Sequence, residues 1–165
     1  MNCLVIIDVQ KGLLVDDATS AIPHKIKELV ASNKFDFIVA TQFKNAMGSP
    51  FDRIMGWNGM SDGQSQELAP EIKEIASHCF VKKVYSCFTE EFVKFIRDNN
   101  IDKLYFTGLD IDACVLKSAL DCFERNINLE VLINYCATSG GEKNFKSAVS
   151  VLEFTLGEGC INRVL

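Results

Sequence analysis

The chain has 165 residues, of which 48% are hydrophobic and 24% charged, and its formal net charge is -5. A chain of about 100 to 200 residues usually forms one domain, with a core large enough to need no disulfide or metal. The mild acidity and the lack of a Lys/Arg cluster argue against a nucleic-acid or membrane surface, so we expect neither partner.

The N-terminal segment and the cysteines point to the cytoplasm. Residues 1–14, MNCLVIIDVQKGLL, have no basic start and carry Asp8 inside the apolar run, which is not typical of a signal peptide. No stretch is long and apolar enough for a membrane span. The seven cysteines form no CxxC pair, which favours a reducing compartment over a disulfide framework. The two histidines have no partner at metal-ligand spacing, so we predict no metal and no cofactor.

Short apolar runs alternate with segments of helical periodicity along the chain. The runs predict strands at residues 3–8, 35–42, 79–84, 103–109, 129–134 and 160–165. The helical spacing of apolar residues predicts helices at 24–33, 89–100, 114–126 and 142–156. Repeated β-α alternation predicts an α/β fold in one domain, residues 1–165, with a parallel sheet covered by helices on both faces.

Residues 43–66 are the exception, because they are rich in Gly, Ser, Asn and Met and have no clear period. Long irregular insertions in compact domains are usually lids or binding loops, although an ornamental loop is the alternative. Ligands of open parallel sheets bind beyond the carboxyl ends of the strands. That rule nominates five segments for the site, namely residues 8–10, 41–45, 82–88, 108–114 and 134–141.

Two charged residues fall at the ends of predicted strands. Asp8 leaves the apolar run CLVII and needs a cationic or hydrogen-bonding partner there, although capping of a following turn is the plain alternative. Lys82 and Lys83 lie in one strand-like run, so alternation turns one inward and leaves the other solvated. The alternative for this pair is a charged edge strand that guards against aggregation.

Cys114 follows the run 103–109 and begins a helical pattern, with Asp112 available as N-cap. The amides and the dipole of a helix start favour a thiolate and can hold an oxyanion. Taken alone, a free cysteine is more often a buried core residue. A carboxylate, an amine and a thiol at one sheet edge, however, supply the base, the electrostatic stabiliser and the nucleophile of a covalent catalyst.

These segments resemble the isochorismatase-like cysteine hydrolases, which include the nicotinamidases and ureido-acid amidohydrolases. LVIIDVQKGLL looks like the family's first strand, with its catalytic Asp at Asp8 and a nearby Gln at Gln10. KKVYSCF is similar to the family's K-x-x-Y-S-x-F segment, which selects Lys82 rather than Lys83. GLDIDACV resembles the family's G-x-x-x-x-x-C-V segment and makes Cys114 the nucleophile.

The resemblance implies a Rossmann-like three-layer α/β/α fold with a six-stranded, mainly parallel sheet, often assembled as a homo-oligomer, a dimer or tetramer. It implies a non-proline cis peptide at Leu109-Asp110 and an oxyanion hole made by the amides of Asp110 and Cys114. The implied reaction is hydrolysis of a C-N bond in a small amide through a thioester. A non-catalytic or redox-active thiol protein on the same fold is the alternative.

The sequence also departs from the nicotinamidase pattern. Phe43 and Asn45 stand where an Asp and a His would help to hold a metal, so the resemblance supports neither a metal site nor nicotinamide as substrate. We expect a small, neutral amide. The substrate-binding side chains are expected from strand ends and from the irregular segment, with Trp57 either capping the pocket or packing at a subunit interface: Gln10, Leu13, Phe43, Asn45, Trp57, Tyr85 and Phe88.

Overall fold

A computed structural model describes residues 1–33 and 35–163. Its centre is a six-stranded sheet in the order β3-β2-β1-β4-β5-β6, in which every neighbouring pair is parallel. This confirms the predicted six-stranded α/β architecture. The strands are β1 (Asn2–Ile7), β2 (Phe37–Phe43), β3 (His78–Lys82), β4 (Lys103–Gly108), β5 (Asn128–Cys136) and β6 (Ile161–Asn162).

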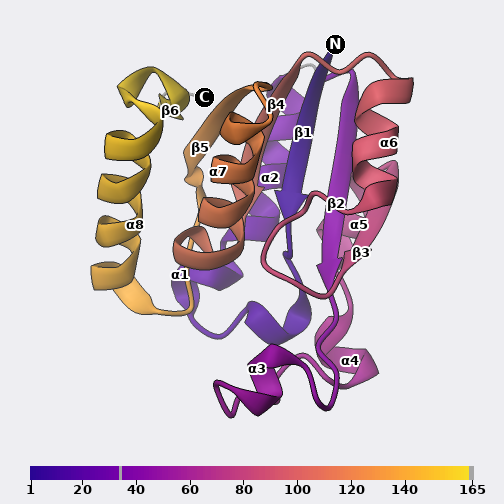
Figure 1. Cartoon of the computed structure of the whole chain (residues 1–165), viewed down its shortest axis with the longest axis vertical. Helices are drawn as coiled ribbons and strands as arrows, with labels where there is room; N and C mark the ends of the chain where they lie inside the picture. Colours follow the sequence, from indigo (N-terminus) through magenta and orange to yellow (C-terminus); the bar gives the residue numbers. More distant parts are fainter. Residues whose placement is uncertain (34, 164–165) are drawn as a thin grey trace.

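Helices cover both faces of the sheet (Figure 1). One face is covered by α6 (Glu90–Asp98), α7 (Leu116–Glu124) and α8 (Gly141–Leu156), and the other by α2 (Ile22–Ser32) and α5 (Pro70–Ile75). Shorter helical turns connect these layers: η1 (Lys11–Leu13), α1 (Asp17–Ser20), α3 (Pro50–Arg53), α4 (Gly63–Gln66), the π-helical η2 (Ile111–Val115) and η3 (Glu158–Cys160).

Each predicted strand and helix has a counterpart in the structure, but several elements differ. The last predicted strand, 160–165, is reduced to Ile161–Asn162, and residues 164 and 165 lie outside the described residues. The segment 43–66, predicted as irregular, contains α3 and α4, and neither α1 nor α5 was predicted. Local caps start α3 and α4, because the Ser49 and Asp62 side chains accept backbone hydrogen bonds there. Such caps stabilise a single turn without any apolar period.

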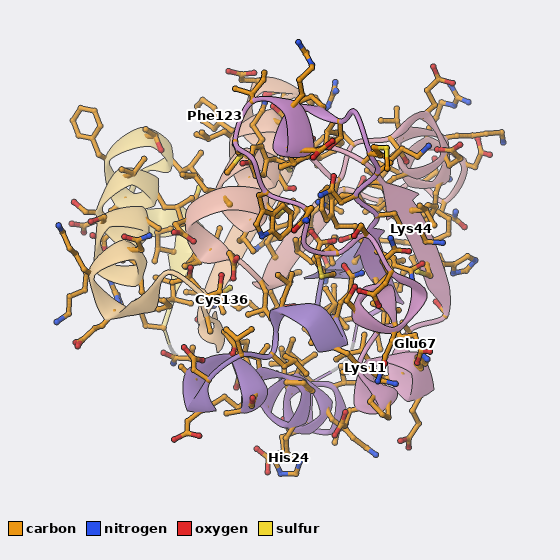
Figure 2. The ribbon with its side chains drawn as sticks, turned by 90° about the horizontal axis from the view of Figure 1, so that it is seen from below. Lys11, His24, Lys44, Glu67, Phe123 and Cys136 are labelled. Atoms are coloured by element: carbon orange, nitrogen blue, oxygen red, sulfur yellow. The ribbon has the colours of Figure 1, made fainter. Side chains whose placement is uncertain are left out.

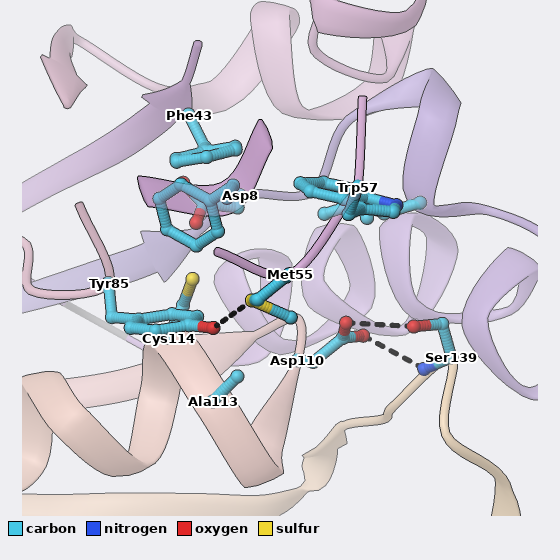
Figure 3. A pocket seen from close by; sticks show the side chains of 11 residues that line it. Asp8, Phe43, Met55, Trp57, Tyr85, Asp110, Ala113, Cys114 and Ser139 are labelled. Atoms are coloured by element: carbon cyan, nitrogen blue, oxygen red, sulfur yellow. Dashed lines mark hydrogen bonds between the residues drawn. The ribbon is translucent and has the colours of Figure 1, made fainter. Parts of the chain in front are cut away.

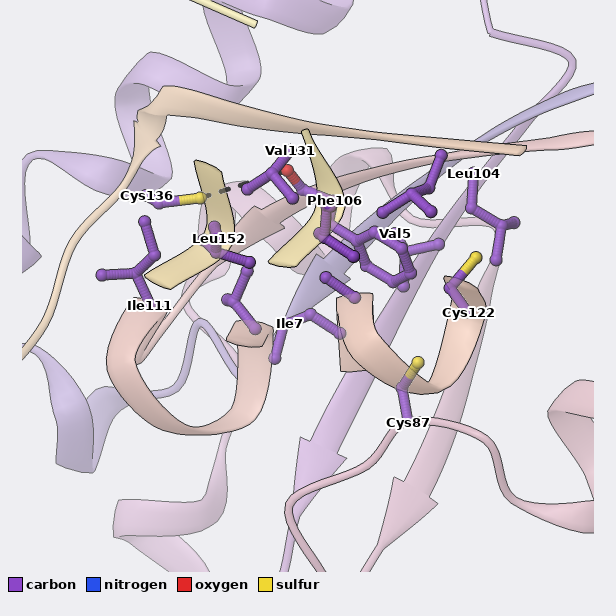
Figure 4. Close-up of a cluster of buried hydrophobic side chains, with 14 of the residues drawn as sticks. Val5, Ile7, Cys87, Leu104, Phe106, Ile111, Cys122, Val131, Cys136 and Leu152 are labelled. Carbon is purple, nitrogen blue, oxygen red and sulfur yellow. Dashed lines mark hydrogen bonds between the residues drawn. The ribbon is translucent and has the colours of Figure 1, made fainter. Parts of the chain in front are cut away.

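The core lies on both sides of β1, whose residues after Asn2 are all buried. Val5 and Ile7 face the layer of α6, α7 and α8, whereas Leu4 and Ile6 face α2 and α5. Figure 4 shows cysteines among the aliphatic side chains of the first cluster. Burial raises the pKa of Cys87 and of Cys136 to about 12, so these thiols behave as small apolar residues.

The carboxyl ends of the strands meet at the edge of the sheet nearest α3 and α4, as the arrowheads of β1 and β2 show (Figure 1). At this edge β4 ends in Gly108, whose φ is +108°. A Cβ built there would lie 2.2 Å from the Ile7 carbonyl oxygen, so only glycine fits. The close approach of β1 and β4 brings the residues after Ile7 and after Gly108 to one place.

Candidate active site

Three side chains from three strand ends meet at this edge. The Nζ atom of Lys82 lies 2.6 Å from Oδ2 of Asp8 and donates a hydrogen bond of 3.2 Å to Sγ of Cys114. The side chains of Asp8 and Lys82 are fully buried. Lys83, by contrast, is exposed, so the inward lysine is the one that the sequence selects. The structure thus brings together all three residues predicted to be catalytic.

Asp8 is held in an unusual backbone conformation by a residue that the sequence did not single out. Its φ is +47°, a left-handed value that Asp tolerates better than most residues. The Asp8 amide donates to Oγ1 of Thr41 at 3.1 Å, and the Thr41 hydroxyl donates back to Oδ1 of Asp8 at 2.7 Å. One carboxylate oxygen is therefore bound to Thr41 and the other to Lys82.

Lys82 is a charged group inside the protein with a full set of partners. Its ammonium group donates to the carbonyl oxygens of Val84 at 2.9 Å and Tyr85 at 3.0 Å, and it lies 5.1 Å from the centre of the Phe43 ring. Burial acts to lower the pKa of Lys82, but the Asp8 carboxylate and Cys114 outweigh burial and raise it. The residue therefore stays a cation.

The electrostatics of Cys114 differ from the prediction that a helix start favours its thiolate. Burial, followed by the negative charge of Asp8, raises the pKa of Cys114 well above its ordinary value, and Lys82 only partly opposes them. The resting group is a neutral thiol beside a carboxylate. Such a thiol reacts only when the neighbouring base removes its proton.

The turn before Cys114 connects two strand ends. The Leu109-Asp110 peptide bond is cis, as the resemblance implies, and η2 follows it directly. The Asp110 carboxylate accepts hydrogen bonds from the amide and the hydroxyl of Ser139, at 2.9 and 2.8 Å (Figure 3). Burial raises the pKa of Asp110, although the hydrogen bonds from Ser139 oppose this shift.

A cavity of about 230 Å³ opens onto these groups. Asp8, Asp110 and Cys114 line it, together with four of the side chains predicted to bind substrate. Figure 3 shows Phe43, Trp57 and Tyr85 around this space. The four predicted side chains that line the cavity are Leu13, Phe43, Trp57 and Tyr85.

Three predicted substrate-binding residues lie elsewhere. The buried Gln10 side chain binds backbone: it donates to the carbonyl oxygens of Phe43 and Gln66 and accepts from the Phe43 amide. The Asn45 amide group donates to two carbonyl oxygens of its own loop, those of Trp57 and Gly59. Phe88 packs against the core. The sequence placed these residues near the ends of strands, but it did not show that two of the side chains bind backbone groups and that the third packs against the core.

Four further residues line the cavity that sequence reasoning did not name. Phe51 and Met55 come from the segment 43–66. The sequence predicted a lid or binding loop there, but no periodicity indicated which of its side chains face the cavity. Ser139 lies in the nominated segment 134–141, and Ala113 is next to Cys114. A small or apolar side chain carries no chemical signal of its own.

The nicotinamidase-like metal site does not fit these residues. Phe43 turns its ring toward the Lys82 ammonium group, and the Asn45 side chain is used within the loop. Over residues 1–33 and 35–163 no group of three or more His, Cys, Asp or Glu side chains is placed to hold a metal ion. In the same ranges no helix is both long and apolar enough to cross a bilayer.

Comparisons with known proteins show similarity to one family. A family profile described as the isochorismatase domain matches residues 2–154. "Isochorismatase family protein 2A" of Dictyostelium discoideum is 28% identical over 160 residues, which cover 90% of this chain and 72% of the relative. A nicotinamidase of Acinetobacter baylyi is 28% identical over 82% of this chain and 81% of its own length. The solved structure of an isochorismatase-like hydrolase from Alkaliphilus metalliredigens superposes with a TM-score of 0.80 at 16% identity, covering 93% of this chain and 91% of that one.

Proposed function

The chain belongs to the isochorismatase family of hydrolases, and we propose that it hydrolyses the C-N bond of a small amide through a thioester on Cys114. The contact that carries this proposal is the Lys82 ammonium group, which lies 2.6 Å from the Asp8 carboxylate and 3.2 Å from the Cys114 sulfur, beside the cavity. Base, cation and nucleophile are thus within reach of one another.

In the first half of the reaction, Asp8 accepts the thiol proton as the Cys114 sulfur attacks the carbonyl carbon. The negative charge that develops on the carbonyl oxygen is stabilised by the amides of Asp110 and Cys114 and by the Lys82 ammonium group. The C-N bond then breaks, and the amine or ammonia leaves with the proton that Asp8 had taken.

In the second half, Asp8 removes a proton from water, and the hydroxide attacks the thioester carbon. The C-S bond breaks, the carboxylic acid is released, and Asp8 returns its proton to the Cys114 sulfur. Burial and then the negative charge of Asp8 raise the pKa of Cys114, so protonation of Asp8 removes the second cause and makes the thiolate a better leaving group than it is beside a charged Asp8. Nicotinamide is not proposed as the substrate, because Phe43 and Asn45 stand where a metal-holding Asp and His would be needed.

The test is ammonia release from a panel of small amides. Cys114→Ala should lower kcat/KM at least about 10³-fold, since removal of a catalytic nucleophile leaves only the contributions of binding and the oxyanion hole. Cys79→Ala, at an exposed cysteine of β3, is the matched control and should keep full activity. Mass spectrometry of rapidly quenched wild-type protein should detect the acyl group on Cys114. Normal turnover by Cys114→Ala would refute the mechanism.

We also propose that the protein works in the cytoplasm and as a homo-oligomer. All seven cysteines are free, which suits a reducing compartment. Exposed apolar side chains gather beside the cavity mouth, where Ile54 and Met55 adjoin Val84 and Tyr85. Apolar patches of this kind are typical of subunit contacts. Sedimentation velocity should find a dimer or larger species, and Val84→Lys should shift it toward the monomer; a wild-type monomer contradicts the proposal.

A further inference from the structure

We propose that the substrate carries a positively charged group, an ammonium or alkylated ammonium, which binds between the Asp110 carboxylate and the aromatic wall of the cavity. The aromatic wall is defined as Phe43, Phe51, Trp57 and Tyr85. This inference rests on the proposed function and adds to it the chemical class of the substrate. A cationic substrate differs in charge from the neutral amide that we expect from the sequence.

The first observation is a carboxylate without a cation. Asp110 lines the cavity, and among the described residues its two oxygens accept hydrogen bonds from the amide and the hydroxyl of Ser139 alone. No ion pair to Asp110 occurs within the stretches 1–33 and 35–163. The neighbouring charges that act on Asp110 are those of Asp112 and Asp8, which are both negative. A partly buried carboxylate in such surroundings is stabilised by a cation, which here would come from the ligand.

Lys82, the cation beside Asp8 and Cys114, is already paired. Lys82 is bound to Asp8 and directs its remaining donors to Cys114 and to two carbonyl oxygens. Asp112, just outside the cavity, is held by the neutral side chains of Thr138 and Asn144, at 2.5 and 3.0 Å. Lys82 is thus paired with Asp8, whereas the carboxylates of Asp110 and Asp112 are bound by neutral groups and add negative charge to the site. The field that results attracts cations and repels anionic substrates.

The second observation is that the cavity walls are aromatic. Phe51 packs edge-to-face against Phe43 and Tyr85, each at 4.9 Å between ring centres, and Trp57 lies 6.1 Å from Phe51. The rings thus form one continuous wall that lines the cavity, and Figure 3 shows three of them, Phe43, Trp57 and Tyr85, around the same space as Asp110 and Cys114. The faces of aromatic rings attract ammonium groups, and methylated ammonium groups lose little hydration on entering such a site.

Size limits the substrate further. The cavity of about 230 Å³ holds both the Cys114 sulfur and the Asp110 carboxylate at its surface. Typical pockets for drug-sized ligands measure about 300 to 1,000 Å³. The amide and the charged group must therefore belong to one small molecule, in which a short linker separates the carbonyl carbon from the nitrogen cation.

The test compares two amides of the same shape, betaine amide, which carries a trimethylammonium group, and tert-butylacetamide, its neutral isostere. We expect wild-type kcat/KM to favour the cationic amide by at least about tenfold, the scale of a desolvated cation-aromatic contact. Malonamate, which carries a carboxylate instead, should be the poorest of the three. A neutral amide that is used as well as the cationic one, or better, overturns the inference while leaving the proposed hydrolase intact.

Variants assign the preference to Asp110. The readout is the ratio of kcat/KM for the cationic amide to that for the neutral amide, so any general loss of activity cancels. Asp110→Asn should bring this ratio close to one. Asp112→Asn removes the same charge from a neighbouring position outside the cavity, and should keep most of the preference. An unchanged ratio in Asp110→Asn contradicts the assignment.

A second measurement covers the case in which Asp110→Asn does not fold or neither amide is turned over. Isothermal titration of Cys114→Ala should show binding of betaine amide at least about tenfold tighter than that of tert-butylacetamide. Tyr85→Leu in the same background, at a half-exposed position of the aromatic wall, should reduce this difference severalfold. Equal binding of the two amides overturns the inference. Selective binding without any turnover by the wild type would instead contradict the proposed hydrolysis.

Discussion

The floor and the wall of the cavity are built in opposite ways. The floor, which consists of Asp8, Thr41, Lys82 and Cys114, rests on strand ends and η2, and the first three of these residues are buried. The wall combines Phe43 at the end of β2 with Phe51 and Trp57 from the chain between β2 and β3 and Tyr85 after β3, and its Trp57 and Tyr85 are more than one third exposed. The groups proposed to react are thus fixed by the sheet, whereas most of the groups proposed to select a substrate lie on connecting segments that can vary without disturbing it.

The two regions also differ in the forces that hold them. In the floor, charges removed from water are stabilised by partners at 2.6 to 3.2 Å, so the loss of one partner leaves another charge buried and uncompensated. In the wall, rings pack against one another at 4.9 to 6.2 Å between centres, and each contact contributes little by itself. Substitutions should therefore have large effects in the floor and graded effects in the wall.

The largest effect should come from Asp8→Asn, which removes both the negative charge of Asp8 and its capacity to act as a base. Asn tolerates the left-handed backbone of this position, so the fold should be retained. Loss of a general base should reduce kcat/KM about 10²- to 10⁴-fold. Because the negative charge of Asp8 raises the pKa of Cys114, its removal lowers that pKa and increases the thiolate fraction.

Alkylation of Cys114 by iodoacetamide near pH 8 should consequently become faster in Asp8→Asn while turnover falls. The rate at Cys160, a free cysteine in the η3 turn before β6, is the internal control and should not change. Peptide mass spectrometry over a time course gives both rates. If alkylation of Cys114 slows together with turnover, Asp8 does not act on the thiol in the manner proposed.

Removal of Lys82 should cost the most stability. Lys82→Ala leaves the Asp8 carboxylate buried without its cation, a change that lowers the free energy of unfolding by about 3 to 5 kcal/mol. The matched control is Lys11→Ala, which breaks the exposed pair with Glu67 seen in Figure 2, at 2.7 Å. An exposed pair contributes less than about 1 kcal/mol. Urea unfolding measures both, and equal losses would contradict the contrast between buried and exposed pairs.

The sequence predicted the floor better than the wall, for a physical reason. Asp8 directly follows an apolar strand, and Lys82 belongs to a pair of which alternation turns one member inward. Cys114 follows another strand and precedes a helical pattern, so each residue is conspicuous locally, and the family resemblance selects Lys82 from the pair. Thr41 does not stand out in the sequence, because threonine is common in strands. Its hydrogen bond to Asp8 depends on the register between β1 and β2. Phe51 and Met55 depend on how α3 folds back over the sheet edge, which a single sequence does not encode locally.

Thr41 provides an intermediate test, since it acts on the reaction only by positioning Asp8. Thr41→Val keeps the shape but removes both hydrogen bonds to Asp8, and kcat/KM should fall about 10- to 100-fold, the scale of a hydrogen bond to a charged group. Thr41→Ser keeps the hydroxyl and should restore most of this loss.

Thr107→Val is the control for Thr41, because Thr107 is also buried in a strand beside β1 but its hydroxyl donates a 3.4 Å hydrogen bond to the neutral Val5 carbonyl oxygen. Its kcat/KM should stay within about twofold of the wild type, since a long, neutral hydrogen bond contributes little. The serine rescue separates positioning from packing: a purely structural role would be reproduced by valine and not by serine.

The smallest effect should come from the wall. Trp57→Leu replaces an indole ring that is 37% exposed and that stacks on Phe43 at 6.2 Å between ring centres. A contact made equally in the ground state and the transition state changes KM and leaves kcat, so KM should rise about two- to tenfold. Met47→Ala, in the same loop at 96% exposure and outside the cavity lining, is the control and should change neither constant. A fall in kcat for Trp57→Leu would mean that the wall also orders the floor, because only a shift of the reacting groups slows the chemical step.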